Sequence, residues 1–348
     1  MRRSIAAAPG DANGTARGAC SLAVMPDDAA AQRLLETLEP IDAAERRRAL
    51  VVVNPHAASV SERLRGLVLY ALASRFSIEA VETRSRGHAI ELSRDAVAAG
   101  YELVVAFGGD GTVNEIANGL AGSNVALTCL PGGSANVFCK LLGIPGELVD
   151  ATAHLLRIAD RFAPRTVDLG LVEGRYYTFS AGVGIDADVV RRVDAHPRLK
   201  ARFGPWFFSA VAVSTYLRRY AARAPRMFVS AGGETYSGVT AVVQNGEHYT
   251  YFHDRPIDLA ADATLDGGTL SGVVLRRASV VGMPTLVVRA MRGSVVRHRR
   301  VAAFSGALTV TVSSAAGRPL PLQVDGDHIG EVTEARFQIS PRALTVVA

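Results

Sequence analysis

The feature that most constrains the fold is an alternation of short apolar runs with segments of helical periodicity between residues 49 and 142. Each apolar run has the length of a buried strand, and each is followed by residues that suit one amphipathic helix. Strands that alternate with helices form a parallel sheet covered on both faces. The predicted strands are Leu50–Val53, Ile78–Thr83, Leu103–Phe107 and Ala126–Leu130, and the predicted helices follow Ser59 or Ser61 and span His88–Ala99, Val113–Leu120 and Ala135–Leu142.

After about Pro164 the rhythm changes to short strands and turns. Turn chemistry is supplied by Asp266-Gly267-Gly268 and Asp325-Gly326-Asp327. This half therefore predicts a mostly antiparallel β domain, interrupted by a helical stretch at about Trp206–Tyr220. The predicted strands are Val167–Val172, Tyr176–Ala181, Met227–Ala231, Gly238–Asn245, Thr269–Leu275, Ala307–Val312 and Ala335–Ile339.

The expected fold class is thus a three-layer α/β domain followed by a β-sandwich domain. Residues 1–48 would be a flexible tail with a short helix, 49–163 the α/β domain and 164–348 the β-sandwich, with a return of the last strand to the first domain left open. Hydrophobic residues make up 49% of the chain and charged residues 20%, which predicts a substantial core. The chain has three cysteines and no apolar run of membrane-spanning length, which predicts a reduced cytoplasmic protein.

The strongest motif is Phe107-Gly108-Gly109-Asp110-Gly111-Thr112, which stands between a predicted strand and a predicted helix. Glycines allow the backbone to approach a ligand closely, and N–H groups at a helix N-terminus bind anions such as phosphate. Asp110 would repel a bare phosphate, so it indicates a metal or a proton-transfer role. An ordinary tight turn is the alternative for this loop taken alone.

Two further loops also follow predicted strands. They are Val53–Ala58 and Leu130–Asn136, and their polar side chains include Asn54, Ser134 and Asn136. Strand-end loops of a parallel sheet converge on one edge, where open α/β sheets bind ligands. The turn Asp325-Gly326-Asp327 adds two carboxylates from the β domain, although alone it would read as a plain hairpin turn.

Together these segments resemble the diacylglycerol kinase catalytic-domain family, in particular its soluble bacterial lipid kinases, which are similar to sphingosine kinases. The resemblance runs from about Ala49 to the C-terminus. The Gly108–Thr112 signature alone is shared with NAD kinases and phosphofructokinases, whereas the ordered set of six motifs is far more specific. The six are Asn54–Ala58, Gly108–Thr112 with Val113-Asn114-Glu115, Pro131–Asn136, Phe179–Ala187, Ala261–Leu270 and Asp325-Gly326-Asp327.

The resemblance implies ATP and Mg²⁺ as cofactors and assigns roles to particular residues. Asp327 would accept the proton of the lipid hydroxyl, with Asp325 beside it. Asp266 would hold a structural magnesium ion, helped by backbone oxygens of Ala263 and Gly268. The implied ATP contacts are Asn54, Pro55, His56, Ala57, Ala58, Thr83, Gly109, Asp110, Gly111, Thr112, Val113, Asn114, Glu115 and Ser134. Asp110 is also our candidate for a catalytic role, through the magnesium ion on the phosphates.

The predicted function is ATP-dependent phosphorylation of a diacylglycerol-like membrane lipid, within phospholipid biosynthesis. The apolar stretch around Trp206–Phe208 with flanking arginines predicts peripheral contact with the inner membrane surface, and the net charge of +5 permits attraction to anionic headgroups. A core helix of the β domain with solvated basic ends is the alternative for this stretch. No nucleic-acid partner is expected, and a homodimer is left open. Two alternatives remain: a NAD-kinase-like small-molecule kinase, and a non-catalytic lipid- or nucleotide-binding protein. The second is favoured by departures from the family pattern at Ala58, Val137 and Asp327.

Overall fold

The apolar runs of the first half form a parallel sheet, and its central strands are buried almost throughout. The structure is a computed structural model that describes residues 46–55, 61–195, 226–252, 255–260, 262–277 and 283–348, with the single positions 211 and 214. Neighbouring strands of this sheet all run parallel. Their order is β2 (Phe76–Glu82), β1 (Arg47–Val53), β3 (Leu103–Gly108) and β4 (Ala126–Pro131).

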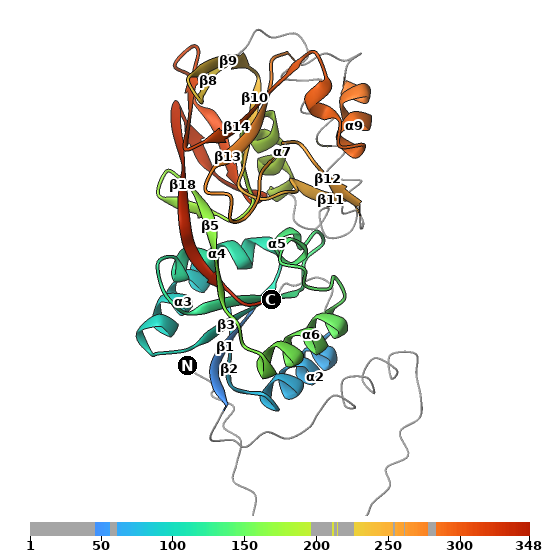
Figure 1. Ribbon diagram of the computed structural model, residues 1–348, viewed down its shortest axis with the longest axis vertical. Helices are drawn as coiled ribbons and strands as arrows, with labels where there is room; N and C mark the ends of the chain where they lie inside the picture. Colours follow the sequence, from blue (N-terminus) through green and yellow to red (C-terminus); the bar gives the residue numbers. More distant parts are fainter. Residues whose placement is uncertain are drawn as a thin grey trace, which may run out of the picture.

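Helices cover this sheet in two pairs, α3 against α4 and α2 against α6 (Figure 1). Ser61 caps α2, because its side-chain oxygen accepts the N–H of Leu64 at 3.2 Å. The helix α6 was not predicted, although Leu148, Ala151 and Leu155 recur at helical spacing and are buried. The helices are α2 (Glu62–Ala73), α3 (His88–Ala98), α4 (Asp110–Leu120), α5 (Val137–Leu141) and α6 (Leu148–Asp160).

The second half forms two sheets that face each other over their own core, which confirms the predicted β-sandwich. One has the order β14-β13-β10-β7-β16-β17, and the other runs from β18 through β15 and β8 to β9. Val183, Val229 and Phe337 are among the buried residues between them. The elements are β5 (Arg165–Val172), β6 (Arg175–Tyr177), β7 (Ser180–Gly184), α7 (Ile185–Asp194), β8 (Met227–Ala231), β9 (Glu234–Gly238), β10 (Thr240–Gln244), β11 (Thr250–Phe252), β12 (Arg255–Ile257), β13 (Leu270–Leu275), α9 (Met283–Met291), η2 (Val295–Arg297), β14 (Val301–Ala307), β15 (Thr309–Ser314), β16 (Leu320–Val324), β17 (Asp327–Val332) and β18 (Glu334–Val346).

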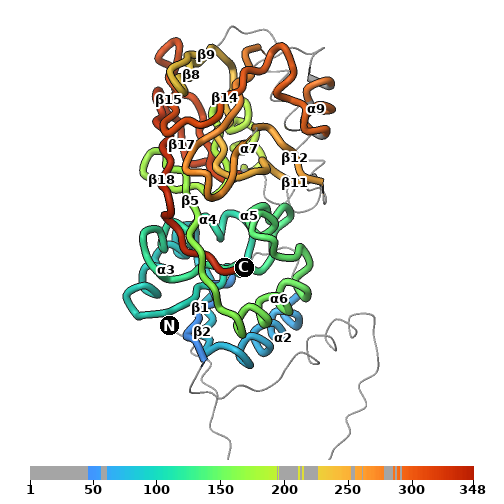
Figure 2. Tube along the Cα trace, in the orientation of Figure 1, coloured from blue at the N-terminus to red at the C-terminus, as the bar shows by residue number. Residues whose placement is uncertain are grey.

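Two long strands join the halves. β18 pairs with β15 in the sandwich, and its last residues reach the first domain, where Val346 lies opposite Leu127 of β4. β5 runs antiparallel beside β18 along most of this path, so the two strands form a continuous connection between the halves (Figure 2). The C-terminal end of the chain therefore completes the parallel sheet of the first domain. This shared sheet fixes the carboxyl ends of the parallel strands relative to the sandwich.

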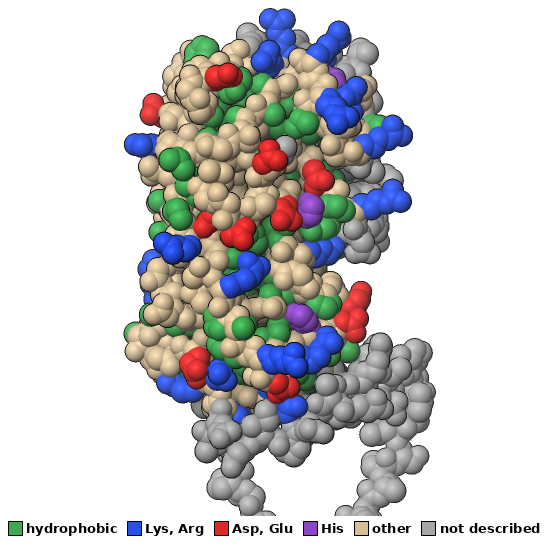
Figure 3. Space-filling view, viewed as in Figure 1, with side chains coloured by type: hydrophobic (Ala, Val, Ile, Leu, Met, Phe, Trp, Pro, Cys, Tyr) green, Lys and Arg blue, Asp and Glu red, His purple; other side chains and the backbone are tan. Residues whose placement is uncertain are grey.

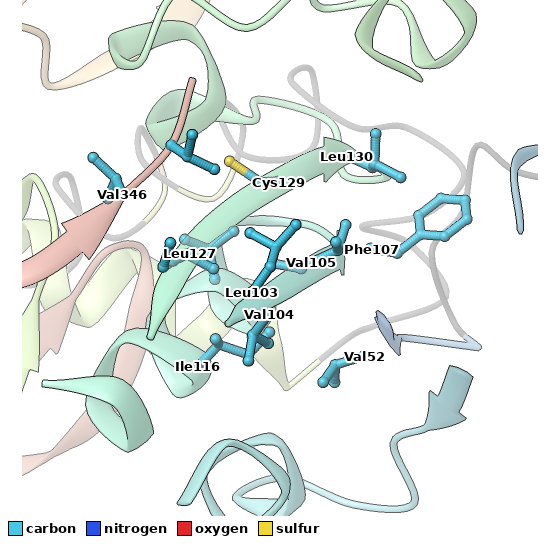
Figure 4. Close-up of a cluster of buried hydrophobic side chains, with 14 of the residues drawn as sticks. Val52, Leu103, Val104, Val105, Phe107, Ile116, Leu127, Cys129, Leu130 and Val346 are labelled. Atoms are coloured by element: carbon cyan, nitrogen blue, oxygen red, sulfur yellow. The ribbon is translucent and has the colours of Figure 1, made fainter. Parts of the chain in front are cut away.

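The first core lies between the parallel sheet and its helices. Side chains of the neighbouring strands β3 and β4 lie side by side there, and Val346 of β18 belongs to the same cluster (Figure 4). Cys129 and Cys139 are free cysteines within this core. Among the described residues, no helix combines the length and the apolar composition that a bilayer crossing requires. The short helix predicted within residues 1–48 lies outside the described residues. Of the helical stretch at Trp206–Tyr220 only positions 211 and 214 are described, and both are helical.

One predicted strand, Tyr176–Ala181, is interrupted. β6 ends at Tyr177 and β7 begins at Ser180, because the backbone N–H groups of Thr178 and Phe179 donate to the carboxylate of Asp325 instead of to a neighbouring strand. Tertiary contact with a distant residue thus decided where these strands end. The interruption lies at the junction of the two domains.

Candidate active site

The strongest sequence motif lies where β3 ends and α4 begins. Gly109 is the N-cap residue of α4, and no side chain caps this helix. Gly108 has no room for a side chain, because a Cβ there would begin 2.6 Å from Oγ1 of Thr112. The same Oγ1 accepts a 3.1 Å hydrogen bond from Nδ2 of Asn54, which follows β1. The first turn of α4 therefore presents backbone N–H groups beside the end of β1.

The loop after β4 packs directly on the loop after β3. A Cβ at Gly133 would begin 2.8 Å from Cα of Gly109, and a Cβ at Gly109 would begin 3.2 Å from Cα of Gly133. Asn136 closes its own loop, since Oδ1 accepts the N–H of Gly133 at 2.8 Å and Nδ2 donates to the carbonyl oxygen of Gly133 at 2.9 Å. Ser134 is exposed in this loop. Ser134 rather than Asn136 can therefore offer its side chain to a ligand.

Thr83 brings a third strand end to the same edge of the sheet. It follows β2, and its N–H donates to the carbonyl oxygen of Val53 at 2.8 Å. Thr83 thus lies beside Asn54 and Pro55, as the convergence of parallel strand ends requires. The remaining predicted contacts of this loop, His56, Ala57 and Ala58, lie outside the described residues.

Asp110 is the first residue of α4 and is partly buried. Its Oδ1 accepts the backbone N–H of Phe138 at 3.1 Å, so the carboxylate also caps α5. Burial, with smaller contributions from the carboxylates of Asp325 and Asp327, raises the pKa of Asp110 to about 6, although the N–H groups of Phe138 and Val137 oppose the rise. A carboxylate perturbed by burial and by other carboxylates is typical of functional sites.

Asp325 is buried at the junction of the domains, where its two oxygens accept five hydrogen bonds. The donors are Nδ2 of Asn114 at 2.8 Å, N and Oγ1 of Thr178 at 2.7 and 2.9 Å, and the N–H groups of Phe179 and Ser180 at 3.1 Å each. Asn114 belongs to α4, so this carboxylate ties the glycine-loop helix to the β domain. These contacts hold the Asp325 carboxylate at the junction, and the catalytic role implied for Asp325 stays a prediction.

Asp327 begins β17 and faces the first turn of α4. Its Oδ2 lies 3.0 Å from the point where a Cβ at Gly111 would begin, and it pairs with Nη2 of Arg86 at 3.2 Å. The turn before it needs left-handed backbone at Asp325, with φ of 47°, and at Gly326, with φ of 82°. The side chain of Asp327 is 25% exposed, so this carboxylate is accessible to a substrate.

The second turn of α4 faces the protein interior. Val113, Asn114 and Glu115, which the family resemblance implied as ATP contacts, are all buried. Oε1 of Glu115 accepts the N–H of Gly87 at 2.8 Å and Oε2 accepts that of Ala89 at 3.2 Å, so Glu115 caps α3. The helical period turns these side chains away from the edge that the first turn faces. Their implied contacts with ATP stay predictions.

The predicted structural magnesium loop is a tight turn before β13. Asp266 is exposed there, whereas the N–H of Gly268 donates to Oδ2 of Asp168 at 2.6 Å. Asp168 is buried and also accepts the N–H of Arg342 at 2.7 Å. Across the described ranges, no group of three or more His, Cys, Asp or Glu side chains is arranged to hold a metal ion. A magnesium ion at Asp266 stays a prediction.

Sequence reasoning missed two polar features near Asp327. Arg86 could have been found as a basic residue in a strand-end loop. The other is a partly buried chain of hydrogen bonds in which Tyr249 donates to Oδ1 of Asp186 and Nε2 of Gln323 donates to Oδ2 of Asp186 at 2.6 Å. Oε1 of Gln323 in turn accepts the N–H of Gly326 at 2.9 Å, next to Asp327. These residues come from three distant segments, so no local pattern could have revealed the chain.

Profiles of two known protein families match consecutive parts of the chain. The profile of the diacylglycerol kinase catalytic domain matches residues 48–172, and that of the YegS C-terminal NAD kinase beta sandwich-like domain matches residues 179–348. The chain belongs to the diacylglycerol kinase catalytic-domain family. The match to the diacylglycerol kinase catalytic domain contains the glycine loop Gly108–Thr112. The match to the beta sandwich-like domain contains the Asp325-Gly326-Asp327 turn.

Relatives in this family cover most of the chain at low identity. The diacylglycerol kinase of Staphylococcus carnosus (strain TM300) is 25% identical over 293 residues, which are 82% of this chain and 90% of the relative. That of Bacillus subtilis (strain 168) is 26% identical over 257 residues, 71% of this chain and 78% of the relative. A crystal structure of a diacylglycerol kinase from Bacillus anthracis (strain Sterne) has a TM-score of 0.61 at 18% identity, covering 87% of this chain and 97% of that one, and supports the fold.

Proposed function

We propose that the protein is an ATP-dependent lipid kinase that transfers the γ-phosphoryl group of ATP to the hydroxyl of diacylglycerol or a related membrane lipid. The products would be ADP and phosphatidic acid or an analogue. The observation that carries this proposal is the contact of Asp327, from the β domain, with the position of Gly111 at the first turn of α4. Phosphorylation of an alcohol needs a phosphate-binding turn and a proton acceptor side by side.

ATP fits the first domain because its strand-end loops lack side chains where phosphates would bind. The uncapped first turn of α4 offers N–H groups, and the contact between Gly109 and Gly133 leaves no Cβ to keep an anion away. Asn54, Thr83 and Ser134 stand around these loops and provide neutral hydrogen-bonding groups for the rest of the nucleotide. Asn54 is already oriented by its contact with Thr112.

Phosphoryl transfer from ATP also requires a divalent cation. Asp110 fits this role, since its carboxylate lies between the two glycine loops and is held by the N–H of Phe138. A bound magnesium ion would supply neutralising charge for the phosphate oxygens. We assign Asp266 to a second, structural ion, on the basis of the family resemblance and its exposed carboxylate.

Asp327 is the proposed proton acceptor. The hydroxyl oxygen of the lipid would form a bond to the γ-phosphorus as the bond from that phosphorus to the bridging oxygen of ADP breaks, and the hydroxyl proton would pass to Asp327. Asp325 would position Asp327 for this step, because its five hydrogen bonds hold the turn that carries Asp327 against α4. The shared sheet of β5 and β18 keeps the two halves in register.

The test is an assay of the purified full-length protein with γ-labelled ATP, magnesium and a panel of lipids in mixed micelles, separated by thin-layer chromatography. We expect label in a phospholipid product when a diacylglycerol or related lipid is present. Asp327→Asn is the control, and it should lose the labelled product while retaining ATP binding. A wild-type protein that binds ATP but labels no lipid in the panel would contradict the proposal.

A NAD-kinase-like activity is the second candidate, since the second half matches a NAD kinase beta sandwich-like domain. Adding NAD to the same assay separates the candidates: phosphorylation of NAD without lipid labelling would favour this reading. A non-catalytic binding protein would label neither acceptor. The carboxylate of Asp327 beside the glycine loop favours catalysis over simple binding.

Peripheral contact with the membrane is part of the proposal. Between Asp266 and Asp325 the sequence has eight arginines and no Asp or Glu. Basic side chains lie along the edge of the β domain near α9 (Figure 3), where Val288 is 46% exposed. A positively charged surface attracts anionic lipid headgroups. The exposed arginines of this stretch are Arg276, Arg277, Arg292, Arg297, Arg299 and Arg318.

Flotation with vesicles containing anionic lipid tests this contact. The double variant Arg292→Glu and Arg297→Glu should bind at least about tenfold more weakly, because each juxtamembrane cation contributes about 1 kcal/mol. Arg94→Glu, which changes an exposed arginine on α3, is the matched control and should bind like wild type. Equal binding by the double variant and wild type would place the membrane contact elsewhere. The predicted contact at Trp206–Phe208 lies outside the described residues.

A further inference from the structure

Arg86 forms an ion pair that crosses from one domain to the other at the candidate active site. Its Nη2 lies 3.2 Å from Oδ2 of Asp327, the oxygen that also lies 3.0 Å from the Cβ position of Gly111. The guanidinium group therefore stands beside the first turn of α4. Its side chain is 60% exposed, so it meets solvent on the side away from Asp327.

The loop that carries Arg86 is anchored to the same helix as the glycine loop. Gly87, the next residue, donates its N–H to Glu115 of α4 at 2.8 Å. At the other end of the loop, Thr83 is joined to β1 through its N–H bond to Val53. The backbone at Arg86 is thus fixed relative to α4, and its side chain extends from this fixed point to the carboxylate contributed by β17.

A phosphate at the first turn of α4 would lie next to the carboxylate of Asp327. Two anions side by side repel each other, so productive binding needs a cation shared between them. A guanidinium group has five N–H donors in a planar fork, and a single contact with Asp327 leaves donors for a second anion. A cationic point at the transferring phosphoryl group also stabilises the charge that develops on its oxygens.

We propose that Arg86 is a catalytic residue that bridges the carboxylate of Asp327 and the γ-phosphate of ATP. This inference rests on the proposed phosphoryl transfer and adds a residue to it. As the lipid oxygen bonds to the γ-phosphorus and ADP departs, the hydroxyl proton moves to Asp327 and Arg86 keeps its own protons. The guanidinium group would hold donor and acceptor anions in line throughout the step.

The test compares Arg86→Gln with Arg84→Gln in the full-length protein. Arg84 lies in the same loop, is exposed and has the same charge, which makes it a matched control. Affinities for ADP and for the β,γ-imido analogue of ATP are measured by calorimetry with magnesium present. We expect Arg86→Gln to weaken binding of the analogue by about 10- to 100-fold, the range of a charge-assisted hydrogen bond, and to leave ADP binding unchanged. Arg84→Gln should change neither.

Turnover supplies the second readout. Arginine residues placed on transferring phosphoryl groups contribute about 10³–10⁵-fold in kcat, so Arg86→Gln should lose most of its activity and Arg86→Lys should recover part of it. Thermal unfolding checks that the variant is folded. Equal weakening of ADP and the analogue, or no weakening of either, would show that Arg86 is a structural ion-pair partner and overturn the inference. If Arg86→Gln loses affinity for the analogue alone and the wild-type protein phosphorylates no lipid, the contact of Arg86 with the γ-phosphate is supported and the lipid kinase proposal is refuted.

Discussion

Replacing Asp110 with asparagine should stabilise the protein at neutral pH while abolishing its activity. The carboxylate of Asp110 is partly buried and close to two others, and its pKa of about 6 lies well above its ordinary value of 3.8. The folded state therefore disfavours the charged form. Asparagine keeps the shape and can still accept the N–H of Phe138 through its side-chain oxygen, but it carries no charge.

The sign of the pH dependence follows from the raised pKa. The unfolded chain releases the proton near pH 4 and the folded chain near pH 6, so the wild-type protein loses stability as pH rises through this window. At about 1.4 kcal/mol for each pH unit, the penalty at pH 7.5 is about 3 kcal/mol. With roughly 2–4 °C for each kcal/mol, Asp110→Asn should melt roughly 6–12 °C above wild type at pH 7.5. Below pH 4 the difference should vanish.

Thermal unfolding at a series of pH values, in buffer free of divalent cations, measures this gap. Asp95→Asn removes an exposed carboxylate on α3 and is the matched control, with the same change in net charge. The electrostatic reasoning fails if Asp110→Asn is no more stable than wild type at pH 7.5, or if the gap persists below pH 4. Asp110→Asn should lose activity whatever its stability, since the proposed cation site needs the carboxylate. Stability gained at the expense of activity is the expected pattern for such a site.

Three further predictions follow from the same geometry. Asp327→Asn should lower kcat by about 10²–10⁴-fold with ATP affinity retained, whereas Asp327→Glu should remain active; a kcat for Asp327→Asn within twofold of wild type would remove Asp327 as the base. Asp325→Ala should destabilise the protein by about 1–3 kcal/mol or more in urea unfolding, since it leaves buried N–H groups unpaired, and a loss below 1 kcal/mol would contradict its role at the junction. Gly133→Ala should weaken ATP binding in calorimetry, because its Cβ would begin 2.8 Å from Cα of Gly109; unchanged affinity would show that the two loops need not touch.

Much of the first domain could be predicted from sequence because its signals are local. The apolar runs that became β1, β3 and β4 are continuous, and the glycine loop follows its strand directly. The helix α4 nevertheless begins at Asp110, three residues before its predicted start, because Gly109 serves as its N-cap residue. The helical period then turns Glu115 inward to cap α3, which motif matching alone could not show.

The sequence by itself determined the alternation of strands and helices from β1 to α5, the glycine-rich turns and the family, since each depends on residues close together along the chain. The tertiary structure alone decided which carboxylates meet the glycine loop. Asp325 and Asp327 are two residues apart, yet one is buried under five donors and the other faces Gly111 and Arg86. That division depends on the left-handed backbone of their turn and on partners more than a hundred residues away. Contacts of such long range leave no local pattern, so they become visible only when the two domains are in place.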